Sequence, residues 1–296
     1  MLQNSEPSLC FLGAGKVGSV LAYHFLKSKI KISGIIERDE TKHSHLTNFF
    51  PEALLDTSPS QEIISQSSLI FISVQDDHLS KAVEQLCDMS TDFLKKIIVH
   101  TSGAHSSKIL SPLKKQSAQI ASAHPIYAFS GNDPDKISLK GVYFDLEGDT
   151  EAVRKLTSLF QKVQIKVIKI STEQKLAIHI ASVFYSNYFV GLAQNAQKVL
   201  HDSQISSENY WQPFLPLIQS TINNLSSNTP DEALTGPIKR GDITTIEKHL
   251  KFLETNLPEV KKNYIRMAQL ILNSISLPTD VENKLTTVLK KFNPSK

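Results

Sequence analysis

The sequence predicts an α/β protein in which a doubly wound parallel sheet is followed by an all-helical C-terminal domain. Three observations support this. Short apolar runs of strand length alternate with helix-length amphipathic segments up to about residue 170. A glycine-rich turn joins the first strand to the first helix. Beyond residue 170 only helical periodicity appears, so we expect domains at 1–170 and 171–296.

The first strand and helix are joined by the motif Gly13-x-Gly15-x-x-Gly18. In such a turn the first glycine allows the tight bend, the second lets the backbone approach a pyrophosphate, and the third lets the helix pack closely on the strand. The first amides of the helix favour bound phosphate. A glycine turn without a ligand is the alternative. We therefore expect NAD(P) to bind the residues Gly13, Ala14, Gly15, Lys16, Val17 and Gly18.

The second strand is expected over Lys31–Glu37, and in dinucleotide folds the end of this strand meets the adenosine ribose. An acidic residue there suits the 2′-hydroxyl of NAD, whereas an arginine suits the 2′-phosphate of NADP. Glu37 and Arg38 offer both, so NAD and NADP stay open, with NADP slightly favoured; a solvated charged turn is the alternative. Val74 ends the continuous apolar strand Leu69–Val74 and Gln75 follows it, and both are expected beneath the nicotinamide half.

Two further strand ends carry polar residues. The strand Ile97–Val99 runs into a loop that contains Ser102 and Gly103, and His124 follows the strand Ile120–Ala123. Open α/β sheets bind ligands at the carboxyl ends of their strands, so these residues are candidates for substrate contact. His124 is either a substrate ligand or general acid, or a histidine satisfied by backbone carbonyls at a turn.

A long helix is expected over Thr172–His201, most of it with an apolar surface. A polar stripe on an otherwise buried helix is costly unless it lines water or a ligand. We therefore take this stripe as a second wall of the site, with a solvent-exposed face as the alternative. At about 100° per residue the stripe consists of Lys175, His179, Ser182 and Ser186, with Asn187 at its edge.

Other features bound the class of protein. A net charge of +3, without a basic cluster interleaved with aromatics, argues against nucleic-acid binding. Cys10 and Cys87 are expected to be buried apolar residues rather than a disulfide or a metal pair, and no metal is expected. Met1–Ser8 lacks a signal-peptide apolar region, and polar residues interrupt Ile178–Leu192, so no membrane span is expected and the cytoplasm is the expected compartment.

A turn-rich polar segment lies in the second half, over Ala233–Asp242. Asp242 is expected to cap the helix that follows it. Arg240 can clamp a carboxylate through two hydrogen bonds, which suggests an anionic substrate.

These motifs carry a family resemblance. The first half resembles the dinucleotide domain shared by ketopantoate reductase, pyrroline-5-carboxylate reductase and the 3-hydroxyacid dehydrogenases. The whole chain is similar to a less characterised branch of NAD(P)-dependent oxidoreductases, with a Rossmann-type N-terminal domain and a C-terminal domain of unknown function. The matching signatures are His100-Thr-Ser-Gly103, His124-Pro125, His179 with Ser186-Asn187-Tyr188, and Leu234-Thr-Gly-Pro-Ile-Lys-Arg-Gly-Asp242.

The resemblance implies a homodimeric oxidoreductase that transfers a hydride to or from a small carbonyl, imine or hydroxy acid in the interdomain cleft. In ketopantoate reductase-like enzymes a lysine opens the first long helix after the sheet, with an asparagine one turn later. Lys175 matches the lysine, but His179 stands in place of the asparagine. The closer branch often has arginine in place of Lys175, so its positive charge is what we expect to matter. The 3-hydroxyacid dehydrogenases imply a substrate contact at Ser102 and Gly103.

Hydride transfer requires a proton donor near the nicotinamide. Histidine titrates near neutral pH, whereas lysine does so only when buried, so His179 is favoured as donor with Lys175 holding charge. The donor stays open among Lys175, His179 and His124. Ser102, His124 and Asn187 are expected to orient the substrate, with Arg240 as an anion clamp. The alternative function is a non-catalytic NAD(P) sensor or interaction protein on the same fold.

Overall fold

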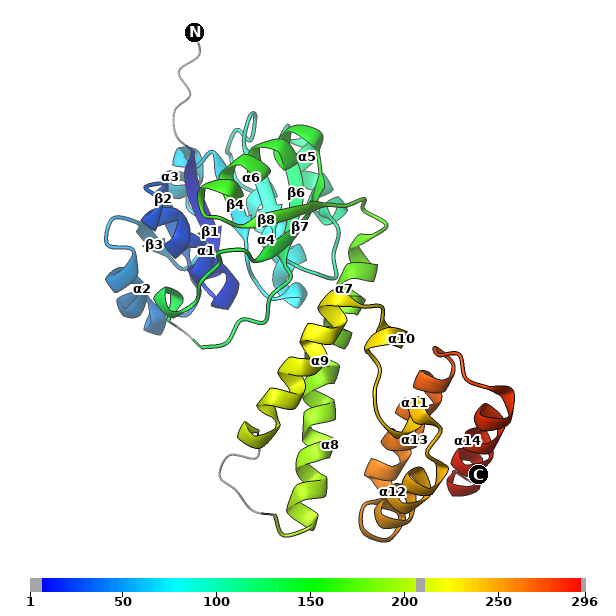
Figure 1. The fold of residues 1–296 in the computed structure, drawn as a ribbon. Coiled ribbons are helices and arrows are strands. Elements are labelled where there is room, and N and C mark those ends of the chain that lie inside the picture. Colours follow the sequence, from blue (N-terminus) through cyan, green and yellow to red (C-terminus); the bar gives the residue numbers. More distant parts are fainter. Residues whose placement is uncertain (1–6, 132, 206–210, 294–296) are drawn as a thin grey trace. The chain divides into compact units, whose positions relative to one another are not determined.

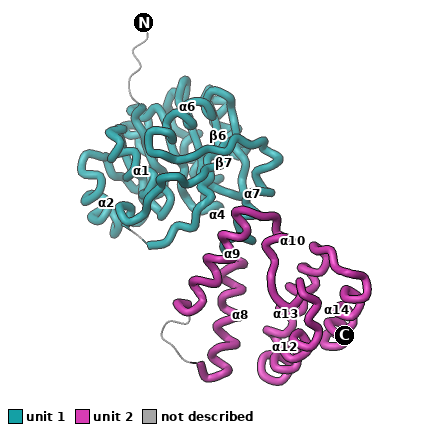
Figure 2. Tube along the Cα trace, viewed as in Figure 1, with its two compact units in different colours: residues 1–187 teal, residues 188–296 magenta. Residues whose placement is uncertain are grey.

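The computed structural model describes residues 7–131, 133–205 and 211–293 (Figure 1). The chain divides into two compact units, Met1–Asn187 and Tyr188–Lys296 (Figure 2). Most of the polar N-terminal stretch, residues 1–6, lies outside the described residues. The first unit contains a sheet, and the second is helical.

One eight-stranded sheet forms the first unit, with the order β3-β2-β1-β4-β5-β6-β7-β8. Its strands are β1 (Ser8–Leu12), β2 (Lys31–Ile36), β3 (Leu54–Asp56), β4 (Leu69–Ile72), β5 (Ile97–His100), β6 (Gln119–Pro125), β7 (Tyr143–Gly148) and β8 (Lys166–Lys169). Neighbouring strands pair in parallel, except that β6 and β7 are antiparallel. The chain winds outward in both directions from β1 and β4, which confirms the predicted doubly wound sheet and adds one reversed pair.

Helices cover both faces of this sheet. The described helices of the first unit are α1 (Lys16–Lys27), α2 (His43–Phe49), α3 (Gln61–Gln66), α4 (Asp76–Cys87), α5 (Ser111–Lys115), α6 (Thr150–Lys162) and α7 (Lys175–Val183), with 3₁₀ turns at Glu40–Lys42, Ser107–Leu110 and Pro134–Lys136. Because successive strand residues point to opposite faces, the sheet feeds two separate cores. Phe11 and Phe71 pack with α1 and α6 on one face, and Cys10 and Ile70 pack with α3, α4 and α5 on the other.

The two cysteines are free thiols, as expected. Cys10 is fully buried within β1, and burial raises the pKa of its thiol to about 12. Cys87, the last residue of α4, is only half-buried, so the expectation that both cysteines are buried is wrong for Cys87.

The second unit is helical throughout its described residues. Its helices are α8 (Phe189–Asp202), α9 (Leu215–Ser227), α10 (Pro230–Ala233), α11 (Pro237–Arg240), α12 (Ile243–Asn256), α13 (Pro258–Leu272) and α14 (Thr279–Phe292). Helices α12, α13 and α14 enclose a core that includes Leu250, Ile265 and Leu289. Asp242 accepts a hydrogen bond from the N–H of Thr245 at 3.1 Å, which confirms the predicted cap of α12.

The last strand ends at Lys169, next to the predicted change of pattern at residue 170, whereas the compact units divide between Asn187 and Tyr188. Helix α7 belongs to the first unit. Its first residue, Lys175, is buried, with its ammonium on Asp145 of β7.

Helix α7 continues through a π-helical turn, Phe184–Tyr188, into α8, so that Lys175–Asp202 forms one helical run. Its mean hydropathy reaches 1.4, and by length and composition alone it could cross a membrane. The expectation that no run approaches a membrane span is therefore wrong for the length and hydropathy of this helix. The three polar residues Ser182, Ser186 and Asn187 are too few to offset its apolar residues. One such helix is weak evidence for a membrane.

The same run is exposed rather than buried, which corrects the expected buried surface of this helix. Phe184, Val190 and Leu192 are all more than 45% exposed. The sequence from Leu176 to Gln197 contains no Asp, Glu, Lys or Arg. This exposed face therefore combines apolar side chains with an absence of charge.

Candidate functional site

Two glycines of the turn between β1 and α1 have no room for a side chain. A Cβ on Gly13 would lie 2.8 Å from the carbonyl oxygen of Ser73, and the residue has φ +93°, which disfavours other residues. A Cβ on Gly18 would lie 2.2 Å from the carbonyl oxygen of Gly13. Both glycines thus serve the tight turn and the close packing of α1 that the sequence predicts.

Gly15 differs, because no atom beyond the adjoining backbone lies within 4 Å of the position its Cβ would take. It borders two pockets that share lining residues, and it serves as the N-cap residue of α1, which has no side-chain cap and no acidic residue in its first turn. Free helix N-terminal amides and open space at a glycine form a cradle for a pyrophosphate. These residues fit the phosphates of a dinucleotide.

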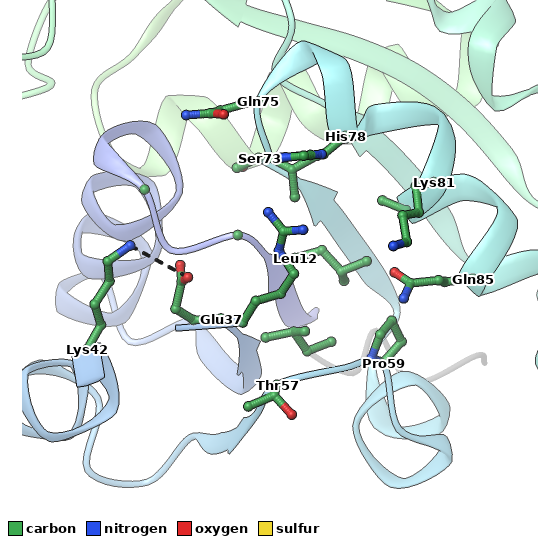
Figure 3. Close-up of a pocket in the computed structure, with 16 residues that line it drawn as sticks. Leu12, Glu37, Lys42, Thr57, Pro59, Ser73, Gln75, His78, Lys81 and Gln85 are labelled. Carbon is green, nitrogen blue, oxygen red and sulfur yellow. Dashed lines mark ion pairs between the residues drawn. The ribbon is translucent and has the colours of Figure 1, made fainter. Parts of the chain in front are cut away.

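The first pocket, here called the ribose pocket, lies at the ends of β1, β2 and β4 and beside α4. Figure 3 shows Glu37 and Lys42 on one side of it, with Lys81 and Gln85 of α4 reaching toward it from the other. Arg38 also borders the pocket and is exposed. Three basic side chains thus surround a space with one carboxylate.

That carboxylate, on Glu37, is engaged within the protein. One oxygen accepts the N–H of Ala14 at 3.1 Å, and the other accepts the N–H of Asp39 at 3.2 Å. The second oxygen also lies 3.6 Å from the ammonium of Lys42 (Figure 3). Glu37 therefore ties the end of β2 to the glycine turn, a role that the sequence did not reveal.

The second pocket, here called the catalytic pocket, shares Gly15, Val74 and Gln75 with the ribose pocket. It extends to the end of β5, at Thr101–Gly103, and to His179 of α7. The predicted phosphate, nicotinamide and substrate residues thus border one continuous space. Ser73 lines both pockets, and its hydroxyl is buried without a hydrogen-bond partner among the described residues, which suits a ligand contact.

Two imidazoles meet over Gly103. A Cβ on Gly103 would lie 2.4 Å from Nδ1 of His179 and 2.7 Å from Nε2 of His124. The two rings are nearly perpendicular, with centroids 5.5 Å apart. Only glycine permits this approach, so Gly103 serves the geometry of the histidines as well as lining the pocket.

Asp145 is hydrogen-bonded to one of these histidines, His124. It lies opposite His124 in the antiparallel register of β6 and β7, and its Oδ2 is 3.0 Å from His124 Nδ1. Its other oxygen, Oδ1, accepts from Nζ of Lys175 at 2.5 Å. Asp145 and Lys175 are each 1% exposed, and Lys175 does not line the catalytic pocket. The ammonium thus serves the carboxylate rather than the pocket.

Burial and the neighbouring charges act in opposite directions on the pKa values of Asp145 and Lys175. Burial acts to raise the pKa of Asp145, but the hydrogen bonds and charges of His124 and Lys175 outweigh it and hold the pKa of this carboxyl below its usual range. Burial lowers the pKa of Lys175. Burial, and then the charge of His124, lowers the pKa of His179. Asp145 is therefore ionised at neutral pH.

The loop after β5 is organised by its own polar groups. The N–H of Ser102 donates to Nδ1 of His100 at 3.2 Å, and the Ser102 hydroxyl accepts from the N–H of His105 at 3.1 Å. His100 is fully buried, and burial lowers its pKa to about 4. The imidazole of His100 is therefore neutral and shapes the loop that presents Ser102 and Gly103.

The structure brings together only part of the predicted site. Ser102, Gly103, His124, Lys175 and His179 gather at one edge of the sheet. Asn187 is the last residue of the first unit and lies exposed within the π-helical turn Phe184–Tyr188, and Arg240, at the end of α11 in the second unit, is exposed.

Asp145 was not among the site residues predicted from the sequence. A signal was present, because an acidic residue stands between Phe144 and Leu146 within a predicted strand. A carboxylate buried in a sheet requires a partner, so this pattern could have directed a search for one.

Two family models match the chain. A Rossmann-like domain matches residues 1–125, and a domain of unknown function, DUF2520, matches residues 142–271. The chain therefore joins a Rossmann-like domain to a DUF2520 domain. No curated protein matches it. Among the described residues, no group of three His, Cys, Asp or Glu side chains is placed to hold a metal ion.

Several solved structures share the fold over most of their length. A Bacteroides fragilis protein named as an NADP oxidoreductase is 21% identical, with 90% of this chain and 98% of that chain covered and a TM-score of 0.73. A Thermotoga maritima protein is 23% identical, with the same coverage and a TM-score of 0.66. An imine reductase from Myxococcus stipitatus, in complex with NADP⁺, is 14% identical, with 97% of this chain and 100% of that chain covered and a TM-score of 0.67.

Proposed function

We propose that this chain, which joins a Rossmann-like domain to a DUF2520 domain, is an NAD(P)-dependent oxidoreductase acting on a small carbonyl, imine or hydroxy acid. One observation carries the proposal: a continuous space extends from the glycine turn at Gly15 to the paired imidazoles over Gly103. The fold shared with the imine reductase from Myxococcus stipitatus supports the same reaction class. A pocket that held a cofactor alone would not need the imidazoles.

The cofactor supplies the hydride when it is bound. The glycine turn and the N-terminus of α1 hold its phosphates, and Val74 and Gln75 lie beneath its nicotinamide half. We favour NADP over NAD. Arg38, Lys42 and Lys81 surround the ribose pocket, which supports a 2′-phosphate, and the oxygens of Glu37 already accept two backbone amides.

The protein supplies the proton. His179 lines the catalytic pocket, and we assign it as the proton donor, with Lys175 holding charge behind it. Ser102 contacts the substrate, together with His124 and Asn187. Arg240 is proposed as a clamp for an anionic substrate, a role that a comparison of acid and ester substrates in an Arg240→Ala variant would test.

Calorimetric titration with NADPH and NADH, followed by cofactor turnover with a panel of small 2-oxo acids, imines and 3-hydroxy acids, tests the function. We expect tight binding of at least one cofactor and turnover with one substrate class. Binding without turnover on any of these would favour the alternative, a non-catalytic NAD(P) sensor. An absence of binding to both cofactors would reject the proposal and the alternative together.

We further propose that two copies of the chain form a homodimer through the exposed helical face. Helices α8 and α9 line an apolar groove together, and Leu217 and Ile222 of α9 are at least 50% exposed. Residues 211–229 carry no charge, so water solvates this face poorly. Light scattering should give twice the mass of 33.0 kDa, and a Leu217→Glu variant should shift it toward the monomer.

The cytoplasmic location also stays a prediction. Cell fractionation tests it together with the apolar helix Lys175–Asp202. A chain recovered only in the membrane fraction would contradict both the cytoplasmic location and the dimer as the cover of this face.

A further inference from the structure

Three observations around His124 call for a common explanation. Nδ1 of His124 faces a carboxylate, Asp145, that is itself bound to the buried ammonium of Lys175. Nδ1 of His179 is buried without a hydrogen-bond partner among the described residues. That atom and Nε2 of His124 both lie within 2.7 Å of the one point above Gly103 that a side chain would occupy.

We propose that Asp145 and Lys175 are positioning residues that fix the proton of His124 on Nδ1, so that His124 and His179 share one transferable proton across Gly103. This inference rests on the proposed function for its reaction, but not for its geometry. The pair differs from a single general acid, because His124 replaces, within the protein, the proton that leaves His179.

The hydrogen-bonding capacity of each group leads to this assignment. A carboxylate only accepts hydrogen bonds, so the imidazole of His124 must donate from Nδ1. The ammonium of Lys175, 2.5 Å from Oδ1, keeps that carboxylate ionised although it is 1% exposed. Nε2 of His124 is then the free nitrogen of this ring, and it lies 2.7 Å from the position that a Cβ on Gly103 would take.

The unpaired nitrogen of His179 fits as the other end of this exchange. When His124 is protonated, its Nε2–H can donate to Nδ1 of His179, which lies beside the same point above Gly103 and has no hydrogen-bond partner among the described residues. The remaining proton of His179 is then on Nε2, which is left for the pocket that His179 lines. In this arrangement His124 donates from Nε2 and His179 accepts at Nδ1, so the buried Nδ1 of His179 gains a hydrogen-bond partner.

The proton transfer balances as follows. When bound, the reduced cofactor would supply a hydride, with its electron pair, to the substrate carbon, and the C=O or C=N π pair would move to oxygen or nitrogen. The N–H bond at His179 Nε2 breaks as the O–H or N–H bond forms, and His179 Nδ1 takes the proton from His124 Nε2. Both histidines end neutral, the cofactor is oxidised and the substrate is reduced.

The charges around His179 permit such sharing. The groups that face it are His124 of β6, Asp145 of β7, Asp76 of α4 and Lys175 of its own helix. Burial and the charge of His124 lower the pKa of His179, so a single proton on the pair is favoured over two. Removal of the His124 ring should therefore raise the pKa of His179.

The test is the nitrogen NMR spectrum of the histidine side chains in the full-length protein without cofactor, with signals assigned from His124→Gln and His179→Gln. We expect His124 to carry its proton on Nδ1 at high pH, against the Nε2–H form that free histidine prefers. In Asp145→Asn this preference should weaken. In His124→Gln the His179 signal should titrate at higher pH than in the wild type.

The matched control is Glu147→Gln. Glu147 is a second buried carboxylate on β7, but it accepts from Ser107 and Thr172 instead of a histidine, so its loss should leave the His124 signal unchanged. Asp145→Asn leaves the Lys175 ammonium buried without its counter-charge. The double variant Asp145→Asn/Lys175→Met removes both charges and should show the same tautomer shift in a folded protein.

Kinetics separate this inference from the proposed function. With an active substrate, Asp145→Asn should lower kcat and change KM by a smaller factor. The fall in kcat should be smaller than in His179→Gln, where loss of a general acid should lower the rate by about 10²–10⁴-fold. An Nε2–H form of His124 in the wild type, or equal spectra for Asp145→Asn and the wild type, would overturn the inference even in an active enzyme. If His124 shows the expected Nδ1–H form but the protein binds neither NADPH nor NADH, the result would overturn the proposed function and leave the inference standing.

Discussion

The imidazole of His124 and the carboxylate of Asp145 face each other across the antiparallel β6–β7 pair, with 3.0 Å between Nδ1 and Oδ2. Antiparallel pairing sets the carboxyl end of β6 opposite the beginning of β7. In a parallel pair, the first residues of β7 would lie at the other edge of the sheet. The reversal of chain direction between β6 and β7 thus delivers a carboxylate to the edge where open α/β sheets bind ligands.

The glycine turn predicts opposite outcomes for two alanine substitutions. Gly18→Ala should destabilise the protein by about 1–3 kcal/mol, because its Cβ would meet the Gly13 carbonyl oxygen at 2.2 Å. Gly15→Ala should leave unfolding nearly unchanged but weaken cofactor binding, because its Cβ enters the open cradle. Thermal unfolding and calorimetry measure the two effects. Full cofactor affinity in Gly15→Ala would place the phosphates elsewhere.

The basic side chains of the ribose pocket should discriminate between the two cofactors. Arg38→Ala and Lys81→Ala should each weaken NADP binding more than NAD binding, because a 2′-phosphate loses a charged partner. Titration of each variant with both cofactors measures the ratio of dissociation constants. Lys115→Ala, on the exposed face of α5, is the control of equal charge. If NAD binds more tightly and Arg38→Ala changes neither affinity, then Glu37 selects NAD.

Gly103 should be essential for turnover. Gly103→Ala places a Cβ 2.4 Å from His179 Nδ1 and 2.7 Å from His124 Nε2, so both imidazoles must move. We expect turnover to fall toward the range for loss of a general acid, about 10²–10⁴-fold. The control Gly191→Ala adds a Cβ in α8 where no atom beyond the backbone of its own helix and its chain neighbours lies within 4 Å. Wild-type turnover in Gly103→Ala would remove the imidazole pair from the mechanism.

His100 should make the fold sensitive to acid. Its pKa is about 4 in the folded chain and 6.5 in the unfolded chain, so only the unfolded chain binds the proton between these values. The free energy of unfolding should therefore fall as pH falls from about 6.5 to about 4, by about 3 kcal/mol in total. Urea unfolding at a series of pH values measures this slope.

His100→Gln is the comparison for that measurement. It removes the titrating group and should flatten the slope over the same range, although its stability at neutral pH will be lower. Parallel slopes in the two proteins would assign the acid sensitivity to other groups. Asp145 acts in the same direction at lower pH, because its folded pKa lies below its usual value and its contribution is lost as pH falls through that folded pKa.

Local sequence patterns were sufficient for much of this protein. The spacing of Gly13, Gly15 and Gly18 predicted a tight turn and an open cradle, and the structure has both. The strands other than β3, the helical second half and the Asp242 cap also followed from short-range rules, whereas the three-residue strand β3 was not expected. Such features depend on residues a few positions apart, whose steric and hydrogen-bonding preferences are the same in any fold.

The pairing of His124 with Asp145, and of Asp145 with Lys175, was decided only by the tertiary structure. These residues are separated by 21 and 30 positions, and they meet because β7 runs against β6 and α7 begins beside the sheet. No periodicity encodes strand direction or cross-strand register, which arise from the packing of the whole sheet. The sequence alone thus supplied the candidate histidines, and the tertiary fold supplied the buried carboxylate that orients one of them.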